Sequence, residues 1–194
     1  MLTEALLLVD WFWPALNGPP IPEEVQKAYV DLWQPLLNLA VAGDNTLILR
    51  DYHSPNLMWL PERAGLQEVG ILDFQDALLG PAAYDLVSLL QDARLDVPEA
   101  LEARQFARYC AARSASDPQF SSDQFSVLYA TLGAQRNSKI LGIFARLAKR
   151  DGKRVCAPTG DAAKALRGRV CGLSVDDAVA LHVRPRACAP RITS

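Results

Sequence analysis

The sequence is short of the residues that build zinc sites and disulfide frameworks. It has four cysteines, Cys110, Cys156, Cys171 and Cys188, and only two histidines. Structural zinc sites need closely spaced Cys and His pairs, and small disulfide-bonded domains need a denser set of cysteines. The composition therefore indicates neither kind of protein and favours one that resides in the reducing cytoplasm.

The chain also lacks an excess of charge of either sign and a long hydrophobic run. Its 194 residues carry 20 Lys and Arg against 22 Asp and Glu, so the net charge is -2. This balance gives no footprint for nucleic acid or for an anionic membrane. The apolar stretch 2–13 contains Glu4 and Asp10 and is shorter than the roughly 20 residues of a membrane span. We therefore expect neither a nucleic-acid partner nor a membrane.

Aromatic residues are missing from one part of the chain. Residues 151–194 contain no Phe, Trp, Tyr or Glu, and they carry eight basic residues against four aspartates. A segment without aromatic anchors can bury little apolar surface. We therefore expect two parts, a folded domain over 1–150 and a poorly ordered or non-native tail over 151–194.

The first 150 residues contain the periodic patterns of helices and strands. Apolar residues surround the stretch 2–13, which predicts a buried helix that ends at Pro14 and the turn over 17–20, and they recur every three or four positions from Pro22 to about Val41, which predicts an amphipathic helix. The remaining predicted elements are strands at 46–50, 57–60 and 69–72 and helices at 82–92, 98–113, 121–135 and 136–150. The predicted fold class is α+β, mainly α, with a small β hairpin inserted among helices.

Carboxylate and amide side chains stand where two of the predicted strands run out into loops. Asp51 and Asn56 are five residues apart, and Asp73 follows a later strand, seventeen residues further on. Phosphoryl transfer needs a carboxylate that orients the attacking hydroxyl, and an amide and a second carboxylate that hold Mg²⁺ against the phosphates. The protein-kinase pattern H-R-D-x-x-x-x-N followed by D-F-G meets this need, and the three residues occupy its Asp, Asn and Asp positions. A metal-hydrolase cluster of Asp51, Asp73 and Asp76 is the rival interpretation, which does not need the asparagine.

The sequence resembles small-molecule relatives of the protein kinases more closely. The aminoglycoside phosphotransferase and choline kinase families have motifs of the form H-G-D-x-H-x-x-N, I-D-[FW]-x-D-A and G-x-x-x-Y-D-L. This chain has LRDYHSPN over 49–56, LDFQDA over 72–77 and GPAAYDL over 80–86. Within that superfamily it looks like the bacterial kinases of cell-wall recycling that phosphorylate N-acetylmuramate and N-acetylglucosamine at the anomeric hydroxyl. The resemblance covers residues 1 to about 153.

The resemblance implies the C-terminal lobe of a protein-kinase-like fold, with ATP, Mg²⁺ and a small sugar as ligands. By position, Asp51 would be the catalytic aspartate that faces the sugar hydroxyl. Asn56 and Asp73 would hold Mg²⁺ and, through it, the phosphates of ATP. Met58 and Leu72 would form the floor of the adenine pocket.

Further residues are assigned weaker roles by the same resemblance. Asp76 would assist the metal or reach the sugar, and His53 would either touch the substrate or brace the loop. Asp85, at a helix start, would fix the loop as a cap. The acceptor side could also be lined by a set of long polar side chains, for which a solvated or structural role is the competing interpretation; these are Arg50, Gln135, Arg136, Asn137 and Lys139.

The chain departs from the family pattern on both sides of the motifs. Only two predicted helices precede Asp51, where the families have a β-rich lobe with a phosphate-covering loop and a strand lysine. We therefore expect a truncated chain that is weakly active or inactive alone, with a shifted reading frame after about residue 153. The alternative is a non-catalytic module that binds Mg²⁺ or a sugar through its acidic loops and a partner through the helix at 2–13.

Overall fold

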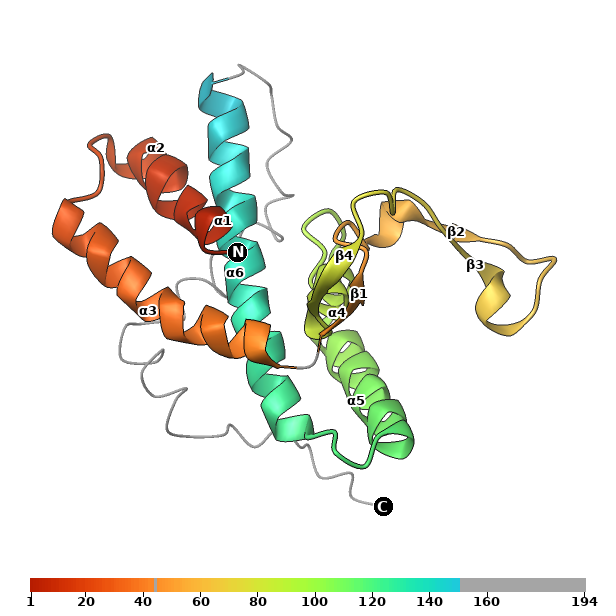
Figure 1. Ribbon diagram of the computed structural model, residues 1–194. Helices are drawn as coiled ribbons and strands as arrows, with labels where there is room; N and C mark the ends of the chain where they lie inside the picture. The colour runs from red at the N-terminus through yellow and green to blue at the C-terminus, as the bar shows by residue number, and fades with distance from the viewer. Residues whose placement is uncertain (44, 151–194) are drawn as a thin grey trace.

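The computed structural model of the chain describes residues 1–43 and 45–150. The tail predicted for 151–194 lies outside the described residues. Helices make up most of the described structure, and four short strands form two small antiparallel sheets (Figure 1). The predicted class, α+β and mainly α, is therefore confirmed.

The chain begins with a continuous helical stretch that changes its winding. It consists of α1 (Leu2–Leu7), a π-helical turn η1 (Leu8–Phe12) and α2 (Trp13–Asn17). The helix was expected to end at Pro14 and the turn over 17–20; Pro14 does not end it, but the turn does. Pro14 lies in the first turn of α2, directly after the π-helical turn, where the regular ladder of backbone hydrogen bonds is already interrupted. The stretch instead ends at Gly18, whose φ of +81° is easily adopted only by glycine.

The second predicted helix is confirmed as α3 (Glu23–Ala42). It begins directly after Pro22, with two glutamates in its first turn, where negative charge is favoured by the helix dipole. Trp33 and Leu37 are buried against α1 together with Ala5. The apolar side of α1 is therefore covered within the chain, and an external partner for this helix stays a prediction.

Four short strands follow, paired as two separate sheets. β1 (Asn45–Ile48) pairs antiparallel with β4 (Leu78–Pro81), and β2 (Leu57–Trp59) pairs antiparallel with β3 (Val69–Ile71). The three predicted strands are confirmed within one or two residues at each end. β4 was not predicted, because Gly80 and Pro81 are typical of turns. In a two-stranded sheet each strand has one unpaired edge. A proline whose nitrogen faces that edge removes no hydrogen bond between the strands.

Two single turns of 3₁₀ helix interrupt this region. η2 (Ser54–Asn56) lies between β1 and β2, and η3 (Gly65–Glu68) closes the β2–β3 hairpin. The hairpin extends away from the helices in Figure 1, while β1 and β4 lie beside α4.

The rest of the described chain is helical, with α4 (Ala83–Leu90), α5 (Glu99–Ser116) and α6 (Ser122–Arg150). The prediction of two helices at 121–135 and 136–150 is wrong, because α6 is one helix of 29 residues. Its polar middle is buried by α1 and α4 rather than exposed as a break. Within the two described ranges, no helix is both long and apolar enough to cross a membrane.

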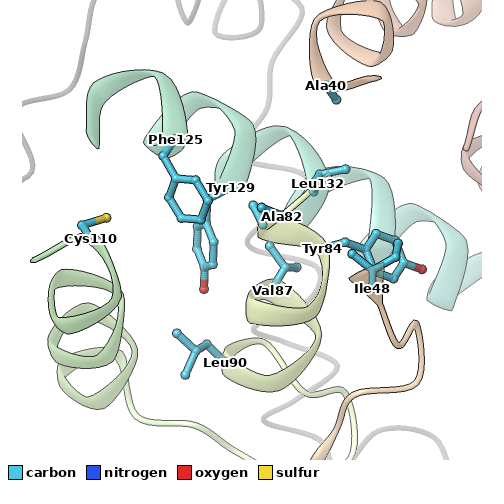
Figure 2. Close-up of a cluster of buried hydrophobic side chains, with 11 residues drawn as sticks. Ala40, Ile48, Ala82, Tyr84, Val87, Leu90, Cys110, Phe125, Tyr129 and Leu132 are labelled. Atoms are coloured by element: carbon cyan, nitrogen blue, oxygen red, sulfur yellow. The ribbon is translucent and has the colours of Figure 1, made fainter. Parts of the chain in front are cut away.

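The main core lies where α6 meets α4 and α5. Figure 2 shows Phe125, Tyr129 and Leu132 of α6 together with Val87 and Leu90 of α4 as members of one cluster of buried side chains. Leu132 and Val87 are at most 1% exposed. The loops that carry the predicted site residues are anchored on this core through β1 and α4, because Ile48 and the start of α4 belong to the same cluster.

Candidate active site

Asp85 fixes the loop that leaves β1. Its carboxylate accepts the backbone N–H of Leu49 at 2.6 Å and that of Arg50 at 3.1 Å. No side-chain hydrogen bond caps α4, so Asp85 holds the loop from across the fold rather than as a cap of its own helix. Burial raises the pKa of Asp85, while these two N–H groups and the nearby charge of Arg136 act to lower it.

The backbone turns sharply directly before Asp51. The Asp51 N–H donates to the carbonyl of Leu49 at 2.9 Å, and Arg50 between them has φ +69°. A three-residue turn with a positive φ at its centre is rare and strained for a residue with a side chain. Conformations of this kind cost about 1–3 kcal/mol each and persist only where the surroundings enforce them. Here the two bonds to Asp85 enforce it.

Asn56 joins the two loops that the sequence identified. Its side-chain amide donates to the carbonyl oxygen of Asp51 at 2.9 Å and lies 3.5 Å from a carboxylate oxygen of Asp73. The backbone repeats this link, because Leu72 N–H donates to the carbonyl of Asn56 at 2.9 Å. The structure therefore brings Asp51, Asn56 and Asp73 together, as their spacing predicted.

Asp73 has the second positive φ among the described non-glycine residues, at +57°. Gln75 donates to its other carboxylate oxygen at 2.5 Å. The side chains of Asp51, Asp73 and Asp76 are all exposed, so a ligand can reach them from solvent. Asp76 shows no contact that assigns it to the metal or to the sugar, and its role stays a prediction.

Asn56 and Asp73 offer oxygen ligands of the kind that Mg²⁺ prefers. The Asn56 amide nitrogen faces the two aspartates, which leaves its carbonyl oxygen for another partner. Within 1–43 and 45–150 there is no group of three or more His, Cys, Asp or Glu placed to hold a metal ion. One amide oxygen and one carboxylate would suit a hard cation that takes its other ligands from a bound molecule.

Met58 and Leu72 stand on the β2–β3 hairpin. Met58 pairs with Gly70, and side chains two residues apart in a strand share a face. Leu72 therefore lies diagonally from Met58 on the same face of the hairpin. Their exposed fractions are 45% and 46%, so this apolar face is open. The adenine role predicted for them stays a prediction.

His53 lies behind the loop rather than on its open side. It is 6% exposed, and its Nδ1 has no hydrogen-bond partner among the residues that the structure describes. Burial lowers the pKa of His53, and the charge of Arg94 lowers it further. Its burial argues against contact with a substrate, and its role in bracing the loop stays a prediction.

Asp92 is a loop-holding residue that the sequence analysis missed. Its side chain is 1% exposed, and it accepts the N–H of Ser54 at 3.3 Å and that of Arg94 at 2.9 Å. Ser54 begins the turn that carries Asn56. Two carboxylates, the half-buried Asp85 in α4 and the buried Asp92 just past the end of that helix, therefore hold the loop at separate points. Asp92 lies past the end of α4, where no helical periodicity marks it in the sequence.

The polar run in the middle of α6 is buried. Gln135, Arg136 and Asn137 are at most 5% exposed, so the solvated role considered for them is wrong. Lys139 donates to a carboxylate oxygen of Glu4 at 2.6 Å, and Gln135 donates to the other at 3.0 Å. Glu4 was also missed, because its partners lie more than 130 residues away in the sequence.

Comparison with known proteins places this geometry in a family. Residues 2–119 match the model of the phosphotransferase enzyme family. The chain is 48% identical to the N-acetylmuramate/N-acetylglucosamine kinase of Caulobacter vibrioides over 122 residues. The aligned residues are 63% of this chain and 32% of that protein.

Two further relatives carry the same name. The protein of Neisseria meningitidis serogroup B is 37% identical over 155 residues, or 79% of this chain and 45% of the relative. That of Pseudomonas putida is 32% identical over 152 residues, or 77% of this chain and 43% of the relative. The chain thus spans less than half the length of the curated relatives that it matches.

Proposed function

Because this chain belongs to the phosphotransferase enzyme family, we propose that it carries the catalytic and metal-binding loops of an ATP-dependent sugar kinase. The observation that carries the proposal is the link made by Asn56. Its amide lies between the backbone of Asp51 and the carboxylate of Asp73, which supports one site for the attacking hydroxyl and for the phosphates. The loops would then belong to the C-terminal lobe of a kinase-like fold.

Asp51 is proposed to orient the sugar hydroxyl and to accept its proton as the oxygen attacks the γ-phosphorus. Its peptide is held on both sides. Its carbonyl accepts hydrogen bonds from the side-chain amide of Asn56 and from the backbone N–H of His53, and its N–H donates to the carbonyl of Leu49. With the backbone fixed and the side chain exposed, the carboxylate is positioned by the loop while remaining open to the substrate.

Asn56 and Asp73 are proposed to bind Mg²⁺ through one amide oxygen and one carboxylate. When bound, the ion supplies positive charge against the phosphates of ATP. The turn at Asp73 and the hydrogen bond from Gln75 fix the carboxylate, so it need not reorganise when the nucleotide arrives. The face with Met58 and Leu72 is proposed to accept the adenine ring.

The acceptor is proposed from the relatives, all of which are named for N-acetylmuramate and N-acetylglucosamine. The reaction would place the phosphate on the anomeric hydroxyl of such a sugar, in recycling of the cell wall. Since the chain spans less than half of each relative, this activity is proposed for the loops and not taken over from the names.

Turnover by the chain alone is proposed to be slow. None of the four strands that the structure describes contains a lysine, whereas kinases use a strand lysine against the phosphates. Loss of one electrostatic contact of this kind costs about 10²- to 10³-fold in rate.

The test is to incubate the purified chain with MgATP and either sugar and to follow ADP. We expect slow release of ADP that depends on the sugar, that rises when the ATP-binding lobe of a relative is added, and that falls at least about 10²-fold in Asp51→Asn. Asp31→Asn, an exposed change on α3, is the matched control and should be unchanged.

Two kinds of result in the same assay would contradict these expectations. ADP release that ignores the sugar, or an Asp51→Asn variant as active as the unmodified chain with the added lobe present, would overturn the proposal. Sugar binding without any turnover, even with the added lobe, would favour the non-catalytic module.

A further inference from the structure

A cleft opens between the first helix and the β1–β4 sheet. Its volume is about 360 Å³, within the roughly 300–1,000 Å³ range of small-molecule sites. The walls are mainly apolar and include Ile48, Leu78 and Tyr84, while Glu4 and Arg50 bring charge to the lining. Mostly apolar walls with a few placed polar groups are typical of a binding site for a small organic molecule.

The cleft adjoins the proposed catalytic loop at Arg50, which lines it. Arg50 directly precedes Asp51, and Asp85 holds the Arg50 backbone in place. Tyr84 lines the cleft at the start of α4, next to Asp85. A molecule in this cleft therefore lies beside the residue adjoining the proposed catalytic carboxylate.

Glu4 is the carboxylate of this cleft and lies within 3.9 Å of two cations, Lys139 and Arg50. One of its oxygens accepts Lys139 at 2.6 Å and the other accepts Gln135 at 3.0 Å. Burial alone would raise the pKa of Glu4, but the hydrogen bond and charge of Lys139, together with Gln135, hold the pKa below its usual value. Glu4 is thus a fixed negative charge at neutral pH.

Arg50 has donors to spare. The closest approach of its guanidinium to Glu4 is 3.9 Å, which is beyond hydrogen-bond reach. Its side chain is 38% exposed, against 18% for Lys139. The Lys139 charge is therefore engaged by Glu4, and the Arg50 charge faces the cleft.

This inference rests on the proposed sugar kinase function. We propose that the cleft is the acceptor subsite, and that Glu4 and Arg50 set its preference between a negatively charged and a neutral N-acetylated amino sugar. N-Acetylmuramate carries a lactyl carboxylate, and N-acetylglucosamine is neutral. The guanidinium of Arg50 binds the carboxylate of the first sugar. Glu4 offsets the positive charge when the second sugar is bound, and its oxygens have lone pairs left to accept sugar hydroxyls.

Exchanging the charges should shift the preference in opposite directions. Glu4→Gln leaves Lys139 and Arg50 without a counter-charge, so the affinity for N-acetylmuramate rises relative to that for N-acetylglucosamine. Arg50→Gln removes the partner of the carboxylate, so the same ratio falls. Each change should move the ratio about tenfold, as expected for a hydrogen bond to a charged group.

The experiment measures the dissociation constants of both sugars with the full chain by nuclear magnetic resonance titration, without ATP. Lys27→Gln, which removes an exposed cation from α3, is the matched control and should leave the ratio unchanged. A ratio is insensitive to partial unfolding, because loss of folded protein lowers the binding of both sugars equally. Circular dichroism of each variant checks the fold.

Opposite shifts of the ratio in the two variants are the expected result. If the sugars bind and the ratio is the same in every variant, the inference is overturned and the proposed function stands. If neither sugar binds and none is phosphorylated when the ATP-binding lobe is added, the proposed function fails and the inference fails with it.

Discussion

At the scale of single residues, buried and half-buried titratable groups surround the loop of the candidate site. Asp85 and Asp92 accept backbone N–H groups of the loop, and burial lowers the pKa of His53 in the same loop. A buried histidine with a lowered pKa binds fewer protons in the folded protein than in the unfolded chain, so folding opposes its protonation.

Acid should therefore weaken the fold through His53. The stability associated with its neutral form is complete above the unfolded pKa of about 6.5 and is lost as the pH falls through the folded pKa. The groups that face it are Arg94, Asp92, Asp51 and Arg136. Between pH 7.5 and 5.5 the free energy of unfolding should fall by at most about 1.4 kcal/mol per pH unit more in the unmodified chain than in His53→Gln.

The measurement is urea unfolding at several pH values for both proteins. Glu4 titrates below this window, since its pKa is lowered from 4.5. Equal pH slopes in the two proteins would contradict the assignment of His53 as a buried neutral group.

Asp85 provides a second prediction at this scale. Its two carboxylate oxygens accept two different N–H groups, whereas an amide offers only one acceptor. Asp85→Asn should lower the free energy of unfolding by about 1–3 kcal/mol.

The matched control for Asp85 is Asp31→Asn. It removes an exposed ion pair with Lys27 and should cost no more than about 1 kcal/mol. Urea midpoints measure both variants, and equal losses would show that the Asp85 bonds add nothing beyond an exposed pair.

At the scale of elements, α6 holds the first helix by close backbone contact. A Cβ on Gly142 would collide with the backbone carbonyl of Leu7 in α1, whereas a Cβ on Gly133 would meet only the end of the Gln91 side chain at 2.8 Å. The backbone cannot give way as a side chain can.

Gly142→Ala should therefore destabilise the protein by about 1–3 kcal/mol, although alanine is the better helix former. Gly133→Ala, in the same helix, should change the stability by less than about 1 kcal/mol, because the gain in helix propensity offsets the displacement of Gln91. Thermal unfolding of both variants tests the pair. Similar losses would mean that α1 does not approach α6 as closely as described.

The elements also show where sequence patterns fail. The amphipathic period predicted α3 within a residue, because one side of that helix faces solvent. The same reasoning divided α6 in two, because it treats a polar run as exposed. Gln135 is fully buried and hydrogen-bonded to residues at the other end of the chain, and no local pattern carries that information.

At the scale of the whole molecule, the candidate site depends on contacts between distant segments. Asp51, Asn56 and Asp73 were predictable as a set because their spacing matches the motif of the phosphotransferase enzyme family. Asp92 and Glu4 were not, because they act through tertiary contacts. The roles of the first three remain predictions until activity is measured.

The most direct test of the central claim is to identify the product. The chain, supplemented with the ATP-binding lobe of a relative, is incubated with MgATP and N-acetylmuramate, and the phosphorus resonance spectrum is recorded. We predict ADP together with a phosphate ester at the anomeric position of the sugar, formed by the unmodified chain and not by Asp51→Asn. Inorganic phosphate without a sugar ester, or the same ester formed equally fast by Asp51→Asn, would contradict the account.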